Sequence, residues 1–132
     1  MSGGAAGGRV GEHRVRRQRA GVGYFGQVRV RVVDGALEGA VVWAVDPEDR
    51  SSLQPGSDRE FVDAAVAGAW DGLGVVGRRG GVVEVLHVQV DLTDIEVSAV
   101  RAAAAMAVVE AFGAGDRVEL AFDGGWVVVP VS

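Results

Sequence analysis

The stretch RRQRAGVGYFGQVRVRV (residues 16–32) places arginines before a glycine-rich segment and then alternates valine with arginine. The alternation over residues 28–32 puts the valines on one face and the arginines on the other. Such a period of two is typical of a strand with one buried face. We therefore predict a strand over residues 24–33 that turns its arginines toward solvent.

Four further strands are predicted downstream. Asp34-Gly35 is a hairpin signal, so residues 37–45 are expected to return as the second strand of a hairpin. Residues 82–90, VVEVLHVQV, are apolar on both faces, which predicts a central buried strand. The segment RVELAFDGGWVVVPV is expected to form a last hairpin that turns at Asp123-Gly124-Gly125.

Two helices are predicted between these strands. A capping box at residues 57–60 opens the first, whose small and apolar residues recur at helical spacing until about residue 74. A second capping box at residues 93–96 opens an alanine-rich helix that closes near Gly113. The order β-β-α-β-α-β-β predicts an α/β (α+β) two-layer sandwich, with two helices on one face of a mostly four-stranded sheet.

Positive charge is concentrated at the N-terminal end. Residues 1–31 hold seven arginines and one acid, whereas the remaining residues hold six arginines and seventeen acids. We predict a disordered Gly/Arg-rich arm over residues 1–15, followed by one domain over residues 16–132. A basic arm on an acidic body can bind anions, but on charge alone we favour a solvated tail.

Composition excludes several kinds of site. The chain has no cysteine and two histidines, so a disulfide framework and a thiolate metal site are ruled out, and we expect no cofactor and no metal. Its apolar runs are too short to span a bilayer, and the N-terminal segment has no apolar core typical of a secretory signal. A cytoplasmic protein without membrane contact is expected.

Candidate catalytic groups are sparse. His87 lies close in sequence to Glu84 and Asp91, so an acid–base pair is conceivable, although a lone histidine in an apolar strand is more often a satisfied core residue. No serine has the G-x-S-x-G pattern of a nucleophile elbow. The larger aromatic residues could line a pocket, but core packing or hairpin cover is the interpretation we favour; they are Trp43, Trp70, Trp126, Phe61 and Phe122.

Three co-linear segments resemble domain IV of translation elongation factor G and its relatives, including the ribosomal protection proteins. The run AGVGYFGQV (20–28), preceded by RRQR, matches a GGxGQYG loop of that family. DREFVDAAVAG (58–68) is similar to the family's first helix, and AAAAMAVVEAF (102–112) is similar to its second. The resemblance covers about residues 16–112 and rests on the order of the three segments, since each alone is short.

The resemblance implies a β-β-α-β-α core of the ribosomal protein S5 domain 2-like kind, with a left-handed βαβ crossover. Sequence-based reasoning alone favours the right-handed form. The family reaches into the decoding site of the ribosome with two tip loops. The residues at the matching positions of the first loop are expected to bind RNA; they are Arg14, Arg16, Arg17, Gln18, Arg19, Gly21, Gly23 and Gln27.

The second tip loop departs from the family pattern. The corresponding loop of this chain is shorter than that of the family and lacks the usual histidine. Its residues Asp91, Thr93 and Asp94 include two acids. Such a tip would be repelled by RNA phosphate. The simpler interpretation of Asp94 and Glu96 is that they serve the N-terminus of the following helix.

No P-loop of the G-x-x-x-x-G-K-[ST] type is present, so GTP hydrolysis is not expected. The sequence therefore predicts a stand-alone, non-enzymatic module that binds the ribosome or its RNA through the basic Gly-rich loop. One alternative is a protein-binding or assembly module, including a homo-oligomer, that uses the acidic body. Another is a small lyase- or cyclase-like enzyme built on the same scaffold.

Overall fold

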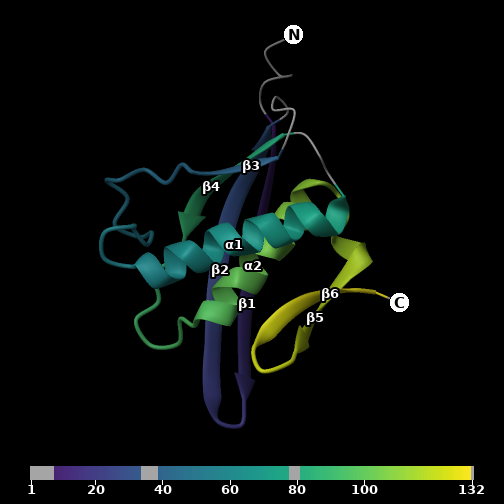
Figure 1. The fold of residues 1–132 in the computed structure, drawn as a ribbon. Helices are drawn as coiled ribbons and strands as arrows, with labels where there is room; N and C mark the ends of the chain where they lie inside the picture. Colours follow the sequence, from purple (N-terminus) through teal and green to yellow (C-terminus); the bar gives the residue numbers. More distant parts are fainter. Residues whose placement is uncertain (1–7, 34–38, 78–80, 132) are drawn as a thin grey trace.

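The central element of the structure is a four-stranded sheet with two helices on one face (Figure 1). The computed structural model describes residues 8–33, 39–77 and 81–131. The sheet has the order β1-β2-β4-β3, in which β4 (Val82–Val88) lies between β2 (Val22–Val33) and β3 (Ala40–Trp43). The mixed α+β two-layer class and the central place of residues 82–88 are thus confirmed.

Strand β1 (Arg9–Arg19) is an element that the sequence pattern did not predict. It pairs antiparallel with β2 along its whole length, from Arg9 opposite Val32 to Arg19 opposite Val22. The predicted disordered arm over residues 1–15 is therefore wrong for residues 9–15, because these belong to the sheet. Residues 1–7 lie outside the described residues.

Strand β3 corrects a second prediction. Residues 40–43 do not pair with β2 as a hairpin would require; they run parallel to β4, with Val41 opposite Val83. The hairpin signal at residues 34–35 lies outside the described residues. Because parallel neighbours need a crossover, α1 (Arg59–Val76) fills the connection between β3 and β4. The left-handed crossover that the resemblance implies would be this β3–α1–β4 connection. The handedness of the connection stays a prediction.

Helix α2 (Val97–Ala111) is the centre of the core. It packs against β1 and β2 on one side and against α1 on the other, and most of its residues are buried. Alanine and glycine make this close packing possible: a Cβ on Gly26 of β2 would stand 2.5 Å from the carbonyl oxygen of Ala99. A helix that is apolar all round is one covered on several sides.

The two helix starts differ from the predicted capping boxes. Asp58 is the N-cap of α1 and makes no side-chain capping bond, while the Ser57 hydroxyl donates to the Asp58 carboxylate at 3.0 Å. Glu96 is the N-cap of α2, and its carboxylate accepts from the amide of Ala99 at 2.9 Å. Glu96 thus serves the helix N-terminus as expected, whereas Asp94 does not.

A separate two-stranded sheet packs against α2 through its second strand. It consists of β5 (Val118–Phe122) and β6 (Trp126–Pro130), which follow the short 3-10 helix η2 (Gly115–Arg117). This confirms the predicted last hairpin. Its turn lies on the same side of the molecule as the closed end of the β1–β2 hairpin, which projects past both helices (Figure 1). None of the helices in the described residues is long and apolar enough to cross a membrane.

Candidate nucleic-acid interface

The residues predicted to bind RNA lie at one end of the β1–β2 hairpin. The expected flexible loop before the first strand is absent, since residues 16–19 end β1 and residues 22–27 begin β2. The whole connection is a two-residue turn at Ala20 and Gly21, whose φ angles are +53° and +80°. Two positive φ angles match the right-handed twist of the flanking strands, so this end of the hairpin is a tight turn.

The arginines of β1 divide between the two faces of the sheet. Val15 is fully buried beneath α2, and residues two positions apart share a face, so Arg17 and Arg19 lie on the helix side. Arg14 and Arg16 lie on the opposite, open side, with Arg16 directly across from Phe25. All four are exposed. The hairpin therefore presents guanidinium groups in two directions.

The two glycines of this region have different roles from the predicted one. Gly21 is needed for its positive φ, and nothing lies within 4 Å of the position where its Cβ would stand. Gly23 is an ordinary strand residue opposite Gln18, and a Cβ there would stand 2.6 Å from the carboxylate carbon of Asp94. The glycine at position 23 thus makes room for the second loop and does not bend the hairpin.

The second tip loop is bonded directly to the hairpin. The amide of Phe25 donates to the carbonyl oxygen of Asp94 at 2.8 Å, and the amide of Glu96 donates to the carbonyl oxygen of Phe25 at 3.1 Å. Leu92 lies in the loop between β4 and Asp94, and its side chain is 94% exposed. The structure therefore brings together the two segments that the resemblance grouped, although it assigns them no ligand.

Asp91 shapes this loop from within. Its carboxylate accepts from the amides of Asp94 at 2.7 Å and Thr93 at 3.0 Å, and from the Thr93 hydroxyl at 3.2 Å. The bond from the Asp94 amide, followed by that from Thr93, holds the pKa of Asp91 below its ordinary value. Arg16 stands 3.7 Å from the same carboxylate. Asp91 thus both shapes its own loop and lies close enough to Arg16 to offset part of its charge.

The polar residues between the arginines make local contacts. Gln27 lies opposite Arg14, and its amide nitrogen donates to the carboxylate of Glu12 at 2.9 Å. Gln18 is exposed on the open face. In the described part of the chain, Arg14 has neither an ion pair nor an aromatic ring beside it. Arg14 is therefore the least constrained of the four arginines.

Aromatic rings beside the other arginines are the part of this region that the sequence did not indicate. The Cζ atom of Arg16 is 4.8 Å from the ring centroid of Phe25. Arg19 is 4.3 Å from the ring of Phe122, and Arg17 is 6.0 Å from that of Trp126. Distances of this size are those of cation–π contacts. Phe122 and Trp126 lie about a hundred positions away, so no spacing rule could have found them.

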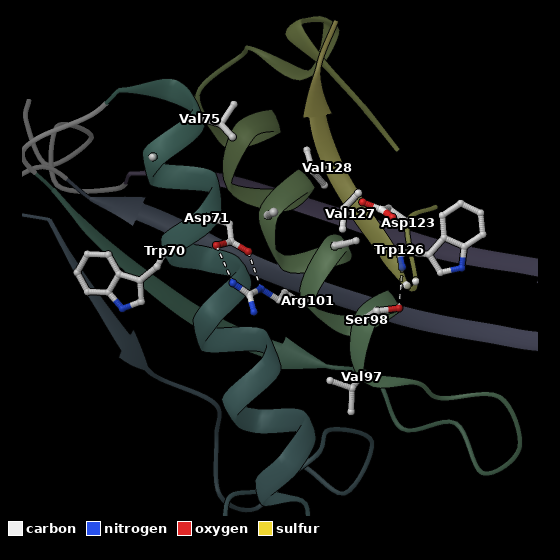
Figure 2. A pocket seen from close by; sticks show the side chains of 15 residues that line it. Trp70, Asp71, Val75, Val97, Ser98, Arg101, Asp123, Trp126, Val127 and Val128 are labelled. Carbon is white, nitrogen blue, oxygen red and sulfur yellow. Dashed lines mark hydrogen bonds and ion pairs between the residues drawn. The ribbon is translucent and has the colours of Figure 1, made fainter. Parts of the chain in front are cut away.

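A groove of about 790 Å³ lies between α1, α2 and β6 (Figure 2). Its walls are mostly apolar, and its central polar contact is between Arg101 and Asp71, at 2.6 and 3.0 Å. The Asp71 carboxylate raises the pKa of the Arg101 guanidinium through these hydrogen bonds. Trp70 and Trp126 line this groove, and Trp126 also packs against the core, as Trp43 and Phe61 do. With its arginine already paired, the groove is a poor phosphate site.

His87 does not form the acid–base pair with Glu84 or Asp91. Its Nδ1 is 3.1 Å from the carboxylate of Asp49, and its Nε2 is 3.0 Å from the side-chain oxygen of Gln89. The ring is buried, so it is the satisfied core histidine of the favoured interpretation. Within residues 8–33, 39–77 and 81–131, no cluster of three or more His, Asp or Glu side chains could hold a metal ion.

Comparisons with known proteins relate the chain to others by fold alone. No family model matches the sequence, and no curated protein does. A crystal structure of a protein from Thermus thermophilus matches with a TM-score of 0.63 at 16% sequence identity. The match covers 91% of this chain and 23% of that chain, so this chain spans less than a quarter of its neighbour's length.

Proposed function

We propose that this chain is an elongation factor G domain IV-like module that binds RNA, in the first instance ribosomal RNA, through the closed end of the β1–β2 hairpin. The observation that carries the proposal is the group of exposed arginines at that end. Arg14, Arg16, Arg17 and Arg19 lie within six consecutive residues of a strand whose end projects past the helices (Figure 1). Guanidinium groups bind phosphate bidentately and stack on bases.

The distribution of charge supports the same surface. The chain is acidic overall, with a net charge of −5, so most of its surface repels a polyanion. A polyanion should therefore approach the arginine-rich end of the hairpin. Because the strand holds these arginines in register, the interface is a folded edge of the sheet and not a flexible arm.

The second loop should limit the affinity. Asp91 stands near Arg16 and partly neutralises it, and Asp94 fills the space beside Gly23. Three arginines therefore carry most of the expected attraction: Arg14, Arg17 and Arg19. The exposed side chain of Leu92 is the apolar group that this loop adds beside the hairpin.

The test is the salt dependence of binding to a short, mixed-sequence, single-stranded RNA, followed by fluorescence anisotropy. Each neutralised phosphate contributes about −0.7 to the slope of log affinity against log salt. Engagement of all four arginines therefore predicts a slope near −3, of which Arg14, Arg17 and Arg19 account for about −2. The triple variant Arg14→Gln, Arg17→Gln and Arg19→Gln should lower the affinity and reduce the slope by about 2. Co-sedimentation with ribosomes at low and high salt extends the measurement to the expected partner.

A charge-matched control removes three exposed arginines from the rest of the chain, by Arg50→Gln, Arg59→Gln and Arg117→Gln. This control should keep the wild-type slope, because its arginines lie away from the hairpin. Equal slopes for the two triple variants would contradict the proposal. The alternative of a protein partner on the acidic body would then move to first place.

A further inference from the structure

The C-terminal hairpin places a cluster of three aromatic rings beside the arginines of β1. Phe122 and Trp126 are paired across β5 and β6, and their ring centroids are 5.2 Å apart. Tyr24 of β2 completes the cluster, at 5.8 Å from Phe122 and 6.1 Å from Trp126. All three contacts are edge-to-face, an arrangement that aromatic pairs favour. The cluster thus joins the two hairpins at the end where the arginines lie.

Two guanidinium groups lie over these rings. Arg19 is 4.3 Å from the centroid of Phe122 and Arg17 is 6.0 Å from that of Trp126. Both arginines remain exposed, so each guanidinium can still be reached from solvent while it lies over a ring. Arg17 also donates from Nη1 to the carbonyl oxygen of Arg16 at 3.1 Å. These contacts restrict side chains that would otherwise sample many rotamers.

The rings are themselves held in place by α2. The amide of Trp126 donates to the hydroxyl of Ser98 at 2.8 Å, an interaction drawn in Figure 2. Gly125 packs against the same serine, since a Cβ at position 125 would stand 3.0 Å from the Cβ of Ser98. The position of Trp126 therefore depends on this contact with α2 and not on the exposed hairpin alone.

We infer that Phe122 and Trp126 are positioning residues that hold Arg19 and Arg17 as a pre-ordered phosphate clamp for RNA. This inference rests on the proposed function and adds to it: the C-terminal hairpin acts on binding through the arginines, although it carries no positive charge in the described residues 118–130. Fixing a long side chain before binding removes an entropic cost that a free arginine bears on forming the complex. Arg14, which has no ring beside it in the described part of the chain, bears that cost in full.

The decisive comparison is between Arg19→Lys and Arg14→Lys. Both variants keep the charge and both lose the bidentate guanidinium, but only the first loses a planar group that stacks on a ring. We expect Arg19→Lys to weaken RNA affinity about three- to tenfold more than Arg14→Lys does, with the salt slope of both close to wild type. Equal losses would overturn the inference.

A second variant removes the ring and leaves every charge in place. Phe122→Leu should weaken binding about three- to tenfold with an unchanged salt slope, since the number of phosphate contacts stays the same. Combined with Arg19→Gln it should add little further loss, because the ring then has no guanidinium to hold. Trp70→Leu, an exposed aromatic on α1, is the matched control and should bind as wild type does.

A measurement without RNA separates this inference from the proposed function. Nitrogen relaxation of the Arg19 Nε–H group should show an ordered side chain in the wild-type protein and a more mobile one in Phe122→Leu. Equal mobility in the two proteins overturns the inference even where RNA binding is intact. A wild-type chain whose RNA affinity is independent of salt overturns the proposed function, and the clamp with it.

Discussion

Replacing Gly68 by alanine should destabilise the protein, although alanine is the better helix former. Gly68 lies in α1 where it crosses α2, and an added Cβ would clash with the carbonyl oxygen of Arg101 and stand 2.9 Å from the Cβ of Ala104. Carbon atoms in contact prefer about 3.5–4.0 Å, so the two helices would have to separate. Overpacking of this kind costs about 1–3 kcal/mol, against about 1 kcal/mol gained from helix propensity.

Because the clash is with backbone, which cannot move aside as a flexible side chain can, the cost should lie in the upper part of that range, about 2–3 kcal/mol. The expected net loss is then about 1–2 kcal/mol, which corresponds to a fall of about 4–8 °C in the thermal midpoint. Urea unfolding followed by far-ultraviolet circular dichroism measures the loss, and an unchanged m-value would show that the unfolding transition is otherwise the same. The matched control is Gly74→Ala in the same helix, where nothing lies within 4 Å of the new Cβ. That variant should gain up to about 1 kcal/mol. A Gly68→Ala protein as stable as Gly74→Ala would falsify the close packing of α1 on α2.

Two further predictions concern the start of α2 and its preceding loop. Glu96→Ala removes the carboxylate that accepts from the amide of Ala99, so it should cost about 1 kcal/mol in urea unfolding, whereas Glu119→Ala, at an exposed strand position, should cost little. Asp91 has a folded-state pKa below its ordinary value of 3.8, so its ionised form adds stability that is present above that value and lost as pH falls through the lower folded pKa. The stability advantage of wild type over Asp91→Asn should therefore shrink between about pH 5 and pH 2, and a constant difference over that interval would count against the bonds from Thr93 and Asp94.

Local pattern was sufficient for the elements whose apolar residues are continuous or recur at a regular spacing. The valines that alternate over residues 28–32 are buried, and the run at residues 82–88 is the central strand that its two apolar faces predict. The alanine-rich segment forms α2. In each case the apolar pattern lies within one continuous segment of the chain. The pattern of that segment is therefore enough to indicate the element.

The same reasoning failed where burial depends on a distant partner. In β1 the face toward α2 is formed by Gly11, His13 and Val15, which do not read as an apolar face. A Cβ on Gly11 would stand 2.9 Å from the amide nitrogen of Ala111, so close helix contact and not side-chain hydrophobicity buries this strand. His13 there bonds to the carboxylate of Glu110 at 2.8 Å. A sequence window around residues 9–19 contains none of these partners.

By itself, then, the sequence determined the class of fold, the amphipathic elements and the arginine-rich segment of the candidate site. Only the tertiary structure decided that residues 40–43 run parallel to β4, because strand order depends on where the crossover helix packs. It also decided that Arg17 and Arg19 lie over Trp126 and Phe122. Those contacts join residues about a hundred positions apart, and the physical reason for them is that α2, through Ser98, holds the C-terminal hairpin beside the end of β1.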